Sequence, residues 1–375
     1  MKYDAERFLK EVLSIPSVNG VDGERNLAVF LRNFLQECGL QVILQEIDKK
    51  HANIIAVLEG ETKETVVWNG HLDTVPYGNP AQWDTDPAVP VKKNGCYYVR
   101  GASDMKSGTA AMVWTLAYMK EKERIPKQTI YFCGTCDEEK DGLGAKYLLE
   151  SGVLGKPSLF LIGEPTSLRP GVAQKGCVWL KLKIHGKTSH GAYPAEGVNA
   201  IEYGMRIFLR LKEKLEKETH EILERPTVQM SMAKGGIVPN MTPDEAEIML
   251  DVRLIPGITT GQFLVWLQEL ITEYTEKTNG DLAVEFHVQN DRMAIEIPKE
   301  NAWARKLDWE LSVKELPYNH VGINYFTDAS IFVKETPEIP VLLFGPGEPQ
   351  MAHKPNEYVE VQKYLEYIDV LKKLF

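Results

Sequence analysis

The stretch Thr65-Val-Val-Trp-Asn-Gly-His71-Leu-Asp73 decides the fold that the sequence predicts. Its first four residues form a short apolar run rich in β-branched side chains, which is typical of a strand buried on both faces. His71 and Asp73 follow this run closely, so two polar side chains with catalytic or metal-binding chemistry stand near the strand's end. The stretch therefore predicts a buried strand that delivers functional groups at its carboxyl end.

The same arrangement recurs along the chain, and stretches with helical spacing separate the repeats. An α/β domain with a largely parallel sheet flanked by helices is the expected result, because strands alternate with helices. In such sheets, functional groups gather beyond the carboxyl ends of the strands. The other strand ends are Thr129–Cys133 before Asp137-Glu138-Glu139, Leu159–Ile162 before Gly163-Glu164, and Val341–Phe344 before Gly345-Pro-Gly347. Expected helices include two within Tyr3–Cys38, Lys106–Lys120, Gly144–Leu149 and Val361–Leu374, and Asn53–Leu58 is a further strand.

From about Cys177 the pattern changes to strand, helix, strand, strand, helix, strand. Val178–Ile184 alternates between apolar and polar residues like a half-exposed strand, and Leu282–Val288 closes the series. This order predicts a small α+β domain with one antiparallel sheet. We therefore expect an inserted domain at 177–288 and a discontinuous larger domain formed by 1–176 and 289–375.

Length and charge restrict the function. A chain of 375 residues exceeds the usual size of one hydrophobic core, which supports two domains. The net charge of -10, with no run of basic residues, argues against nucleic acid as a partner. The charged N-terminus and the lack of a long apolar stretch argue against a secretory signal and a membrane span, so a cytoplasmic location is expected.

The five cysteines fit reduced thiols better than a disulfide framework. Cys133-Gly-Thr-Cys136 has the spacing of half a zinc ribbon or of a redox pair, but no second such pair completes a four-thiolate site. A metal or redox role is one interpretation of this pair. The simpler one is that Cys133 ends a buried strand and Cys136 lies in the loop after it.

Several side chains suited to metal binding follow the predicted strands or precede a helix. Each alone has an ordinary explanation, because an Asp before a helix is a common N-cap and a loop His is usually solvated. Together they form the kind of set that a two-metal hydrolase requires: carboxylates, imidazoles and positions left for water and substrate. The set comprises His71, Asp73, Asp104, Glu138, Glu139, Glu164 and His353.

The motifs around these residues resemble one family, which includes acetylornithine deacetylase, succinyl-diaminopimelate desuccinylase, aminoacylase and glutamate carboxypeptidase. They occur in the family's order across nearly the whole chain. The resemblance implies a zinc-peptidase-like catalytic domain with an inserted ferredoxin-like domain that serves as a lid or for dimerisation. The motifs are Gly70-His-Leu-Asp-Thr-Val-Pro76, Arg100-Gly-Ala-Ser-Asp-Met-Lys106, Asp137-Glu-Glu139, Gly163-Glu-Pro165 and Ala352-His353.

The resemblance also implies two Zn²⁺ ions per subunit, with Co²⁺ or Mn²⁺ as substitutes. Asp104 would bridge the two ions. His71 and Glu164 would complete one site, and Glu139 and His353 the other. In similar enzymes the residue at Glu138 is the general base, and Asp73 resembles a carboxylate that orients the base and a ligand, with a turn cap as its alternative.

Further residues resemble the family's substrate-binding groups. His190 would reach the partner subunit's active site to stabilise the oxyanion, which implies a homodimer; a structural hydrogen bond or plain exposure are its alternatives. Asn240 would hold the oxyanion and Arg253 a substrate carboxylate, although Arg253 could also form only a surface ion pair. Thr327, Gly345 and Gly347 are expected to line the pocket.

The expected function is hydrolysis of the amide bond in a small N-acyl amino acid. Exopeptidase action on a short peptide is the alternative within the family, and a catalytically silent binding homologue is the alternative outside it. No G-x-S-x-G elbow and no early G-x-G-x-x-G motif supports a serine hydrolase or a nicotinamide enzyme. Two departures from the family pattern, at Val99 and at Tyr325-Phe-Thr-Asp328, leave the substrate's shape open.

Overall fold

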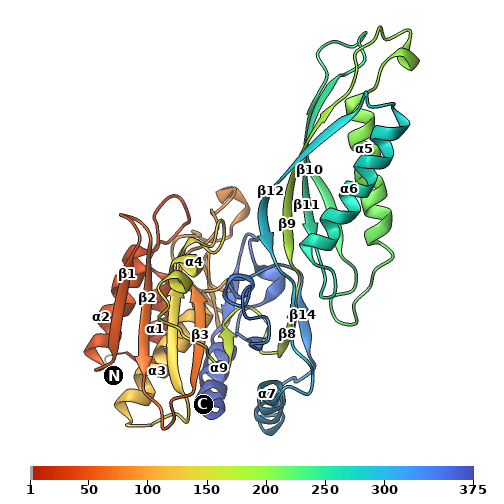
Figure 1. Cartoon of the computed structure of the whole chain (residues 1–375). Helices are drawn as coiled ribbons and strands as arrows, with labels where there is room; N and C mark the ends of the chain where they lie inside the picture. The colour runs from red at the N-terminus through yellow and green to blue at the C-terminus, as the bar shows by residue number, and fades with distance from the viewer. Residues whose placement is uncertain (1–2) are drawn as a thin grey trace. The chain divides into compact units, whose positions relative to one another are not determined.

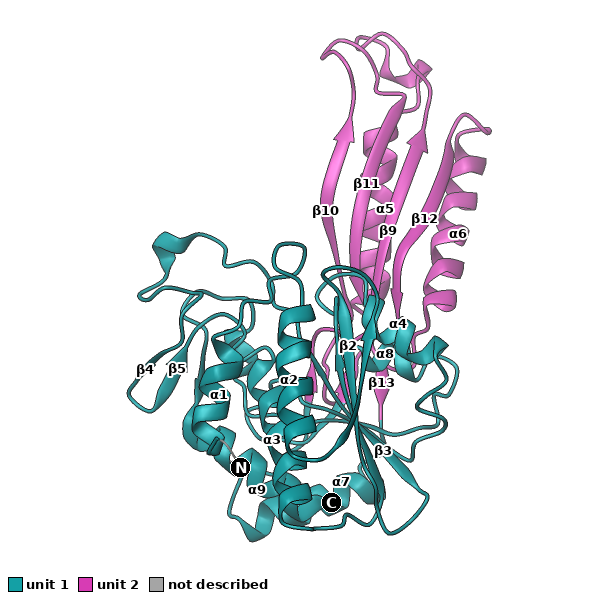
Figure 2. Ribbon diagram, turned by 90° about the vertical axis from the view of Figure 1, so that its left-hand side faces the viewer, with its two compact units in different colours: residues 1–172, 297–321, 327–375 teal, residues 173–296, 322–326 magenta. Residues whose placement is uncertain are grey.

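A computed structural model describes residues 3–375, which form two compact units (Figure 2). Unit 1 contains the described residues up to Val172, together with Ile297–Val321 and Thr327–Phe375. Unit 2 contains Ala173–Glu296 and the short segment Gly322–Phe326. The chain therefore enters unit 2 twice, once for a long stretch and once for a few residues.

The helices of unit 1 cover both faces of its main sheet. In Figure 2, α1, α2, α3 and α9 lie on one side of the strands, and α4 and α8 lie on the other. The two helices expected within Tyr3–Cys38 are confirmed as α1 and α2. In the described part of the chain, no helix is both long and apolar enough to cross a membrane. The helices are α1 (Ala5–Leu13), α2 (Arg25–Glu37), α3 (Lys106–Glu121), α4 (Leu143–Glu150), α7 (Ala302–Val313), α8 (Ala329–Phe332) and α9 (Val361–Leu374).

The main sheet has a parallel centre and antiparallel edges, with the strand order β1-β2-β6-β3-β7-β15-β8-β13 and β14 beside β8. Strands β6, β3, β7 and β15 run parallel, which confirms the expected largely parallel sheet. The strands are β1 (Gln41–Glu46), β2 (Ala52–Leu58), β3 (Thr65–His71), β6 (Thr129–Thr135), β7 (Phe160–Ile162), β8 (Gly171–Gln174), β13 (Ile295–Glu296), β14 (Val321–Ile323) and β15 (Val341–Leu343).

Two strands run further than the apolar pattern indicates. His71 is the last residue of β3, not a residue beyond it, and pairs with Thr135 of β6. Likewise Cys133 lies inside β6, so the expectation that it ends the strand is wrong. The polar ends of both strands stay in the sheet because their side chains are buried and bonded there. The amide of Asn69, for example, donates to the Thr135 hydroxyl at 3.0 Å.

A small second sheet in unit 1 joins distant parts of the sequence. It has the order β16-β5-β4, and the pattern of apolar residues gave no sign of it. The pairing of Tyr358 with Tyr98 places the segment before α9 next to the segment that leads into Arg100–Asp104. The strands are β4 (Val91–Lys93), β5 (Cys96–Tyr98) and β16 (Tyr358–Glu360).

Helix α3 starts two residues after Asp104 and is buried along most of its length. Its Gly108 allows the backbone after β7 to come very close, because a Cβ atom there would lie 2.0 Å from the carbonyl oxygen of Gly163. No other residue type fits this contact without a backbone shift. The contact brings the start of α3 next to the loop that carries Glu164.

Unit 2 is a four-stranded antiparallel sheet of order β10-β11-β9-β12 with helices α5 and α6 on one face (Figure 1). Residues of β9 alternate between buried and exposed, and the buried ones, such as Leu180 and Leu182, join the helices in one apolar core. The expected α+β domain with one antiparallel sheet is confirmed. Its elements are β9 (Cys177–His185), α5 (Ala200–Leu215), β10 (Thr227–Gly235), β11 (Glu245–Arg253), α6 (Thr260–Lys277) and β12 (Ala283–Arg292).

Candidate metal centre

The carboxyl ends of β3, β6 and β7 lie side by side in the parallel part of the sheet. His71 ends β3, Glu138 and Glu139 follow β6, and Glu164 follows β7. The parallel register gathers these side chains because parallel strands all end at the same edge. Two further loops, which carry Asp104 and His353, complete the group.

Asp104 lies between two imidazoles and offers one oxygen to each. Its Oδ1 is 3.0 Å from Nε2 of His71, and its Oδ2 is 3.4 Å from Nε2 of His353. Each imidazole also faces a second carboxylate: Glu164 lies 3.9 Å from His71 Nε2, and Glu139 lies 3.0 Å from His353 Nε2. The arrangement is two His-carboxylate groups that share Asp104.

This cluster holds more negative charge than its two histidines can balance. Burial raises the pKa of Glu138 and of Glu164 well above the ordinary carboxyl range. Hydrogen bonds to Asp104 and Glu139 raise the pKa of His353 to about 10.

One oxygen of Glu138 and one of Glu164 are buried without a hydrogen-bond partner. Imidazoles and carboxylates are zinc ligands, so the unpaired oxygens and the excess charge fit divalent cations.

Asp73 fixes the backbone of the two glutamates. Its Oδ1 accepts from the N–H of Glu138 at 3.1 Å, and its Oδ2 accepts from the N–H of Glu139 at 3.0 Å. His71 Nδ1 lies 3.0 Å from the backbone carbonyl of Asp73, closer than the 3.7 Å to its carboxylate. The side chain of Asp73 thus orients the glutamate pair, while its backbone orients the imidazole.

Asn19 belongs to the same network, although no motif in the sequence pointed to it. Its side-chain amide donates to Asp73 at 2.8 Å and to Asp137 at 3.0 Å. Asn19 lies far from both residues in the sequence, in a loop before α2. Only the packing of that loop against the end of β3 reveals the contact.

Glu357 is a second residue that the sequence analysis missed. Its buried carboxylate accepts from the backbone N–H groups of Gly101, Ser103 and Asp104 at 2.8–3.1 Å, and it pairs with Arg100 at 2.7 Å. It therefore shapes the loop that presents Asp104. The only local signal is that Glu357 directly precedes β16, which pairs with the strand before this loop.

Gly345 and Gly347, which were expected to line the pocket, lie where two stretches of backbone are in close contact. A Cβ atom on Gly345 would lie 2.4 Å from the carbonyl oxygen of Gly163, and one on Gly347 would lie 2.2 Å from that of Ser103. Both glycines thus allow close approach to the loops that carry Glu164 and Asp104. Thr327 is fully buried, and its hydroxyl accepts from the N–H of Ala329 at the start of α8.

The remaining predicted residues belong to unit 2 and lie at two opposite ends of its sheet. His190 and Asn240 are neighbours, because the N–H of Gly191 donates to the carbonyl of Asn240 at 2.8 Å. Arg253 ends β11, whose other end follows Asn240. The nine residues of β11 span roughly 25 Å at about 3.3 Å per residue. The sheet therefore separates Arg253 from the pair of His190 and Asn240.

Arg253 and His190 also differ in their local contacts. The Arg253 guanidinium forms two hydrogen bonds with Asp251, at 2.7 and 3.0 Å, and lies over the ring of Phe326. His190 is exposed, and its Nδ1 accepts from the N–H of Ala192 at 3.1 Å. Arg253 is held in place by its carboxylate partner, while the Nε2 atom of His190 is left for another contact.

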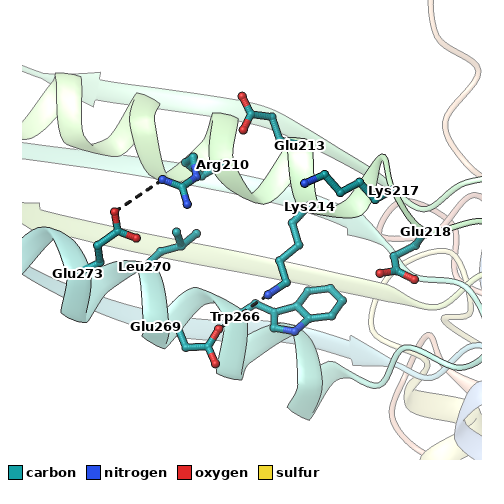
Figure 3. Close-up of a pocket in the computed structure, with 9 residues that line it drawn as sticks. All are labelled: Arg210, Glu213, Lys214, Lys217, Glu218, Trp266, Glu269, Leu270 and Glu273. Carbon is teal, nitrogen blue, oxygen red and sulfur yellow. Dashed lines mark ion pairs between the residues drawn. The ribbon is translucent and has the colours of Figure 1, made fainter.

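Unit 2 has a groove of about 390 Å³ between α5 and α6, but it contains none of the predicted residues (Figure 3). Its charges pair across the two helices: Arg210 lies 3.6 Å from Glu273, and Lys214 lies 3.8 Å from Glu269. Lys214 also covers the ring of Trp266 at 4.5 Å. These pairs lie within unit 2 and involve no residue of the candidate metal centre, so the groove shows no chemistry related to that centre.

Known proteins resemble this chain over most of its length. The sequence model of "Peptidase family M20/M25/M40" matches residues 67–375. A probable succinyl-diaminopimelate desuccinylase from Staphylococcus aureus is 27% identical over 98% of this chain and 95% of its own. An acetylornithine deacetylase from Aliivibrio salmonicida is 29% identical over 98% of this chain and 97% of its own.

Solved structures share the fold. A tripeptidase from Staphylococcus aureus has a TM-score of 0.80 and 22% identity, covering 99% of this chain and 97% of its own. A metallo-carboxypeptidase from Sulfolobus solfataricus has a TM-score of 0.78 and 16% identity, covering 99% of this chain and 98% of its own. At these identities the likeness concerns the arrangement of the helices and strands.

We predict that Glu357→Gln destabilises unit 1 and lowers the affinity of the candidate metal centre for metal ions. The substitution leaves the buried Arg100 without a counter-charge, which typically costs about 3–5 kcal/mol, and removes an acceptor from the Asp104 loop. Urea unfolding and metal content after dialysis measure the two effects. Glu360→Gln, on an exposed carboxylate that pairs with Lys363, is the matched control and should change stability by less than about 1 kcal/mol. A Glu357→Gln protein as stable as the wild type would contradict the role of this pair.

Proposed function

Since the chain belongs to the peptidase family M20/M25/M40, a family of metallohydrolases that act on amide and peptide bonds, we propose that it hydrolyses an N-acyl amino acid. The observation that carries the proposal is the position of Asp104 between two imidazoles, each with a second carboxylate of its own. Two metal ions with one bridging carboxylate need such a set.

The five predicted ligands divide into two groups. His71, Glu164 and one oxygen of Asp104 would hold one zinc ion, and Glu139, His353 and the other oxygen of Asp104 would hold the second. When bound, the ions polarise the scissile carbonyl and acidify the attacking water. Co²⁺ or Mn²⁺ could replace zinc, because neither imidazole nor carboxylate restricts a site to zinc.

Glu138 has the features of the general base. It neighbours the ligand Glu139 in sequence, yet one of its buried oxygens has no partner and is left for a water molecule. The hydrogen bond from its N–H to Asp73 fixes its backbone. Its carboxylate would take the proton from the attacking water and pass it to the leaving nitrogen.

Two kinds of relative bear on the substrate. The desuccinylase and the deacetylase, whose names state removal of an acyl group from an amino-acid derivative, match over nearly the whole chain at 27–29% identity. The tripeptidase and the carboxypeptidase share the fold at lower identity. Deacylation is therefore the first candidate, and exopeptidase action on a short peptide is the second.

We also propose that the enzyme works as a homodimer. His190 and Asn240 would stabilise the oxyanion, and Arg253 would bind the substrate carboxylate. However, His190 and Asn240 lie at one end of the sheet and Arg253 lies at the other. A dipeptide-sized substrate spans about 7 Å, far less than β11. Two chains would resolve this separation, with His190 and Asn240 from one chain and Arg253 from the other meeting the same substrate.

The test of the proposed function is metal reconstitution of chelator-treated protein, followed by hydrolysis of N-acetyl and N-succinyl amino acids alongside dipeptides and tripeptides. We expect no activity without metal and restored cleavage of the acylated amino acids with zinc or cobalt. Cleavage of peptides alone would select the exopeptidase alternative. A protein that binds two metal ions and cleaves nothing in the panel would favour the catalytically silent homologue.

Glu138→Gln is expected to lower kcat by about 10²- to 10⁴-fold, the usual contribution of a general base, while metal content stays near that of the wild type. The amide keeps the shape of the side chain but cannot accept the proton from water. Asp141→Asn, on an exposed acid in the same loop, should leave kcat unchanged. If Glu138→Gln retained most of its activity, another residue would have to be the base.

Mixed dimers test the role of His190. We expect His190→Ala and Asp104→Asn to be nearly inactive alone and to regain activity when co-expressed with different tags and purified as heterodimers. One metal centre of the heterodimer is then intact and receives a wild-type His190 from the other chain. The pair Asp104→Asn with Glu138→Gln should not recover, because one active site lacks the bridging ligand and the other lacks the base. A heterodimer of the first pair without activity would place His190 in its own subunit or outside catalysis.

A further inference from the structure

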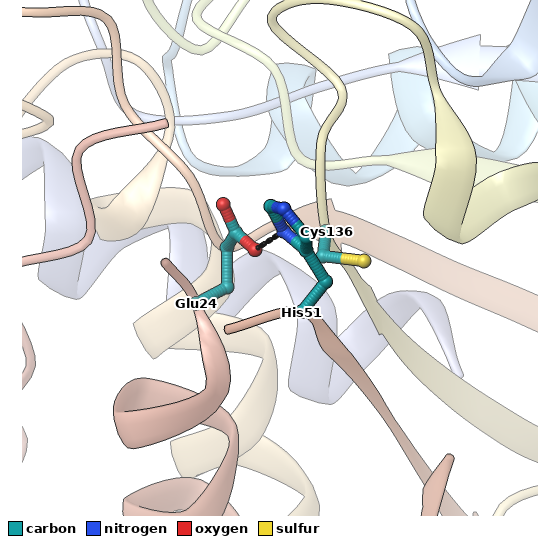
Figure 4. Close-up of side chains that lie close together, drawn as sticks. All are labelled: Glu24, His51 and Cys136. Atoms are coloured by element: carbon teal, nitrogen blue, oxygen red, sulfur yellow. Dashed lines mark hydrogen bonds and ion pairs between the residues drawn. The ribbon is translucent and has the colours of Figure 1, made fainter. Parts of the chain in front are cut away.

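A second group of metal-binding side chains lies in unit 1 and shares no residue with the candidate metal centre. It consists of Glu24, His51 and Cys136, whose carboxylate oxygen, ring nitrogen and sulfur all lie within 4.8 Å of one another (Figure 4). Glu24 directly precedes α2, His51 precedes β2, and Cys136 follows β6. Three distant segments of the chain therefore bring one ligand each.

The contacts within this group leave one carboxylate oxygen of Glu24 without a hydrogen-bond partner. His51 Nδ1 lies 2.7 Å from one oxygen of Glu24, and Figure 4 shows the carboxylate facing the imidazole. The other oxygen, Oε1, is buried without a hydrogen-bond partner, although the side chain of Glu24 is fully inaccessible. The carboxylate does not cap α2 either. An ion pair with His51 thus accounts for only one of the two oxygens.

The surroundings of the group are strongly negative. Burial, with a further contribution from the nearby Asp73, raises the pKa of Glu24 to about 7. Burial and the carboxylates of Glu24 and Asp73 also raise the pKa of the Cys136 thiol. His51 is the only cationic partner within the group, and Asp48 and Asp137 face it as well. A divalent cation would relieve this repulsion and give the unpaired oxygen a partner.

Thiolate, imidazole and carboxylate are the three ligand types that zinc takes in proteins, and a site with three protein ligands leaves a fourth position for water. We infer that Glu24, His51 and Cys136 bind one zinc ion, in addition to any ions in the candidate metal centre. Binding displaces the thiol proton and the imidazole proton, because both ligands bind the metal in their deprotonated forms.

The position of Cys136 gives this site a structural role. Its backbone N–H donates to the side chain of Asn53 at 3.1 Å, and its carbonyl accepts from the N–H of Gly144 at 3.0 Å. The residue therefore sits at a fixed point in the loop that continues to Glu138 and Glu139. A zinc ion here would tie this loop to the start of α2 and to the beginning of β2.

Cobalt titration of the full-length, chelator-treated protein tests the inference. A cysteine thiolate bound to Co²⁺ produces a near-ultraviolet charge-transfer band, whereas the residues of the candidate metal centre are His, Asp and Glu and produce none. We expect the band in the wild type and its loss in Cys136→Ser. Cys133→Ser, on a buried cysteine of β6 outside the group, is the matched control and should retain the band.

Zinc content gives a second readout and a second variant. After reconstitution and dialysis, His51→Gln should hold one zinc ion per chain fewer than the wild type; its side chain is partly exposed, so the fold tolerates the change better than a change at Cys136. A saturating titration without the band, or a band that persists in Cys136→Ser, would overturn the inference. Neither readout uses hydrolysis, so this result is independent of the substrate panel.

Discussion

The burial of several carboxylates at one edge of a parallel sheet is the constraint on which unit 1 depends. Asp73, Asp104, Glu138 and Glu164 are all nearly inaccessible to solvent. An isolated buried charge costs several kcal/mol, so each of these groups needs hydrogen bonds, a cationic neighbour or a metal ion. The surrounding loops supply the first two, and the oxygens that remain unpaired on Glu138 and Glu164 are the ones that metal chemistry would use.

Most of the structure around this edge serves to hold loops at fixed positions. The Glu357 carboxylate accepts a hydrogen bond from the backbone of the Asp104 loop, and the Asp73 carboxylate accepts hydrogen bonds from the backbone of the two glutamates after β6. Glycines at 108, 345 and 347 let the same loops approach each other's backbones. Most of the ligands therefore lie in loops, but hydrogen bonds and close backbone packing fix those loops in place, which is what two closely spaced metal sites require.

Unit 2 presents its functional candidates in a different way. Its sheet and two helices form a core of their own, and the candidates lie at the two ends of the strands, not on a common edge. A single unit of this kind cannot offer both ends to one small substrate. Combined with the roles that the family resemblance assigns to His190, Asn240 and Arg253, the length of β11 is a physical reason for the proposed dimer.

The sequence by itself determined the local features of this protein. Apolar runs that end in His, Asp or Glu predicted the strands and most of the candidate site, because buried parallel strands leave a strong signal over a few residues. Motifs such as His71-Leu-Asp73 and Glu138-Glu139 are visible because their residues lie close together in the sequence and resemble a known family's. The alternation in 178–184 likewise predicted the antiparallel sheet of unit 2.

Only the tertiary structure decided which distant residues support the site. Glu357 contacts Asp104 across more than half the chain, Asn19 contacts Asp73, and Glu24 meets His51 and Cys136. The return of Gly322–Phe326 to unit 2 is of the same kind. These contacts follow no period along the sequence, because a hydrogen bond between two loops depends on how the elements beneath them pack. A carboxylate in a loop therefore looks the same in sequence whether it is solvated or holds a metal centre together.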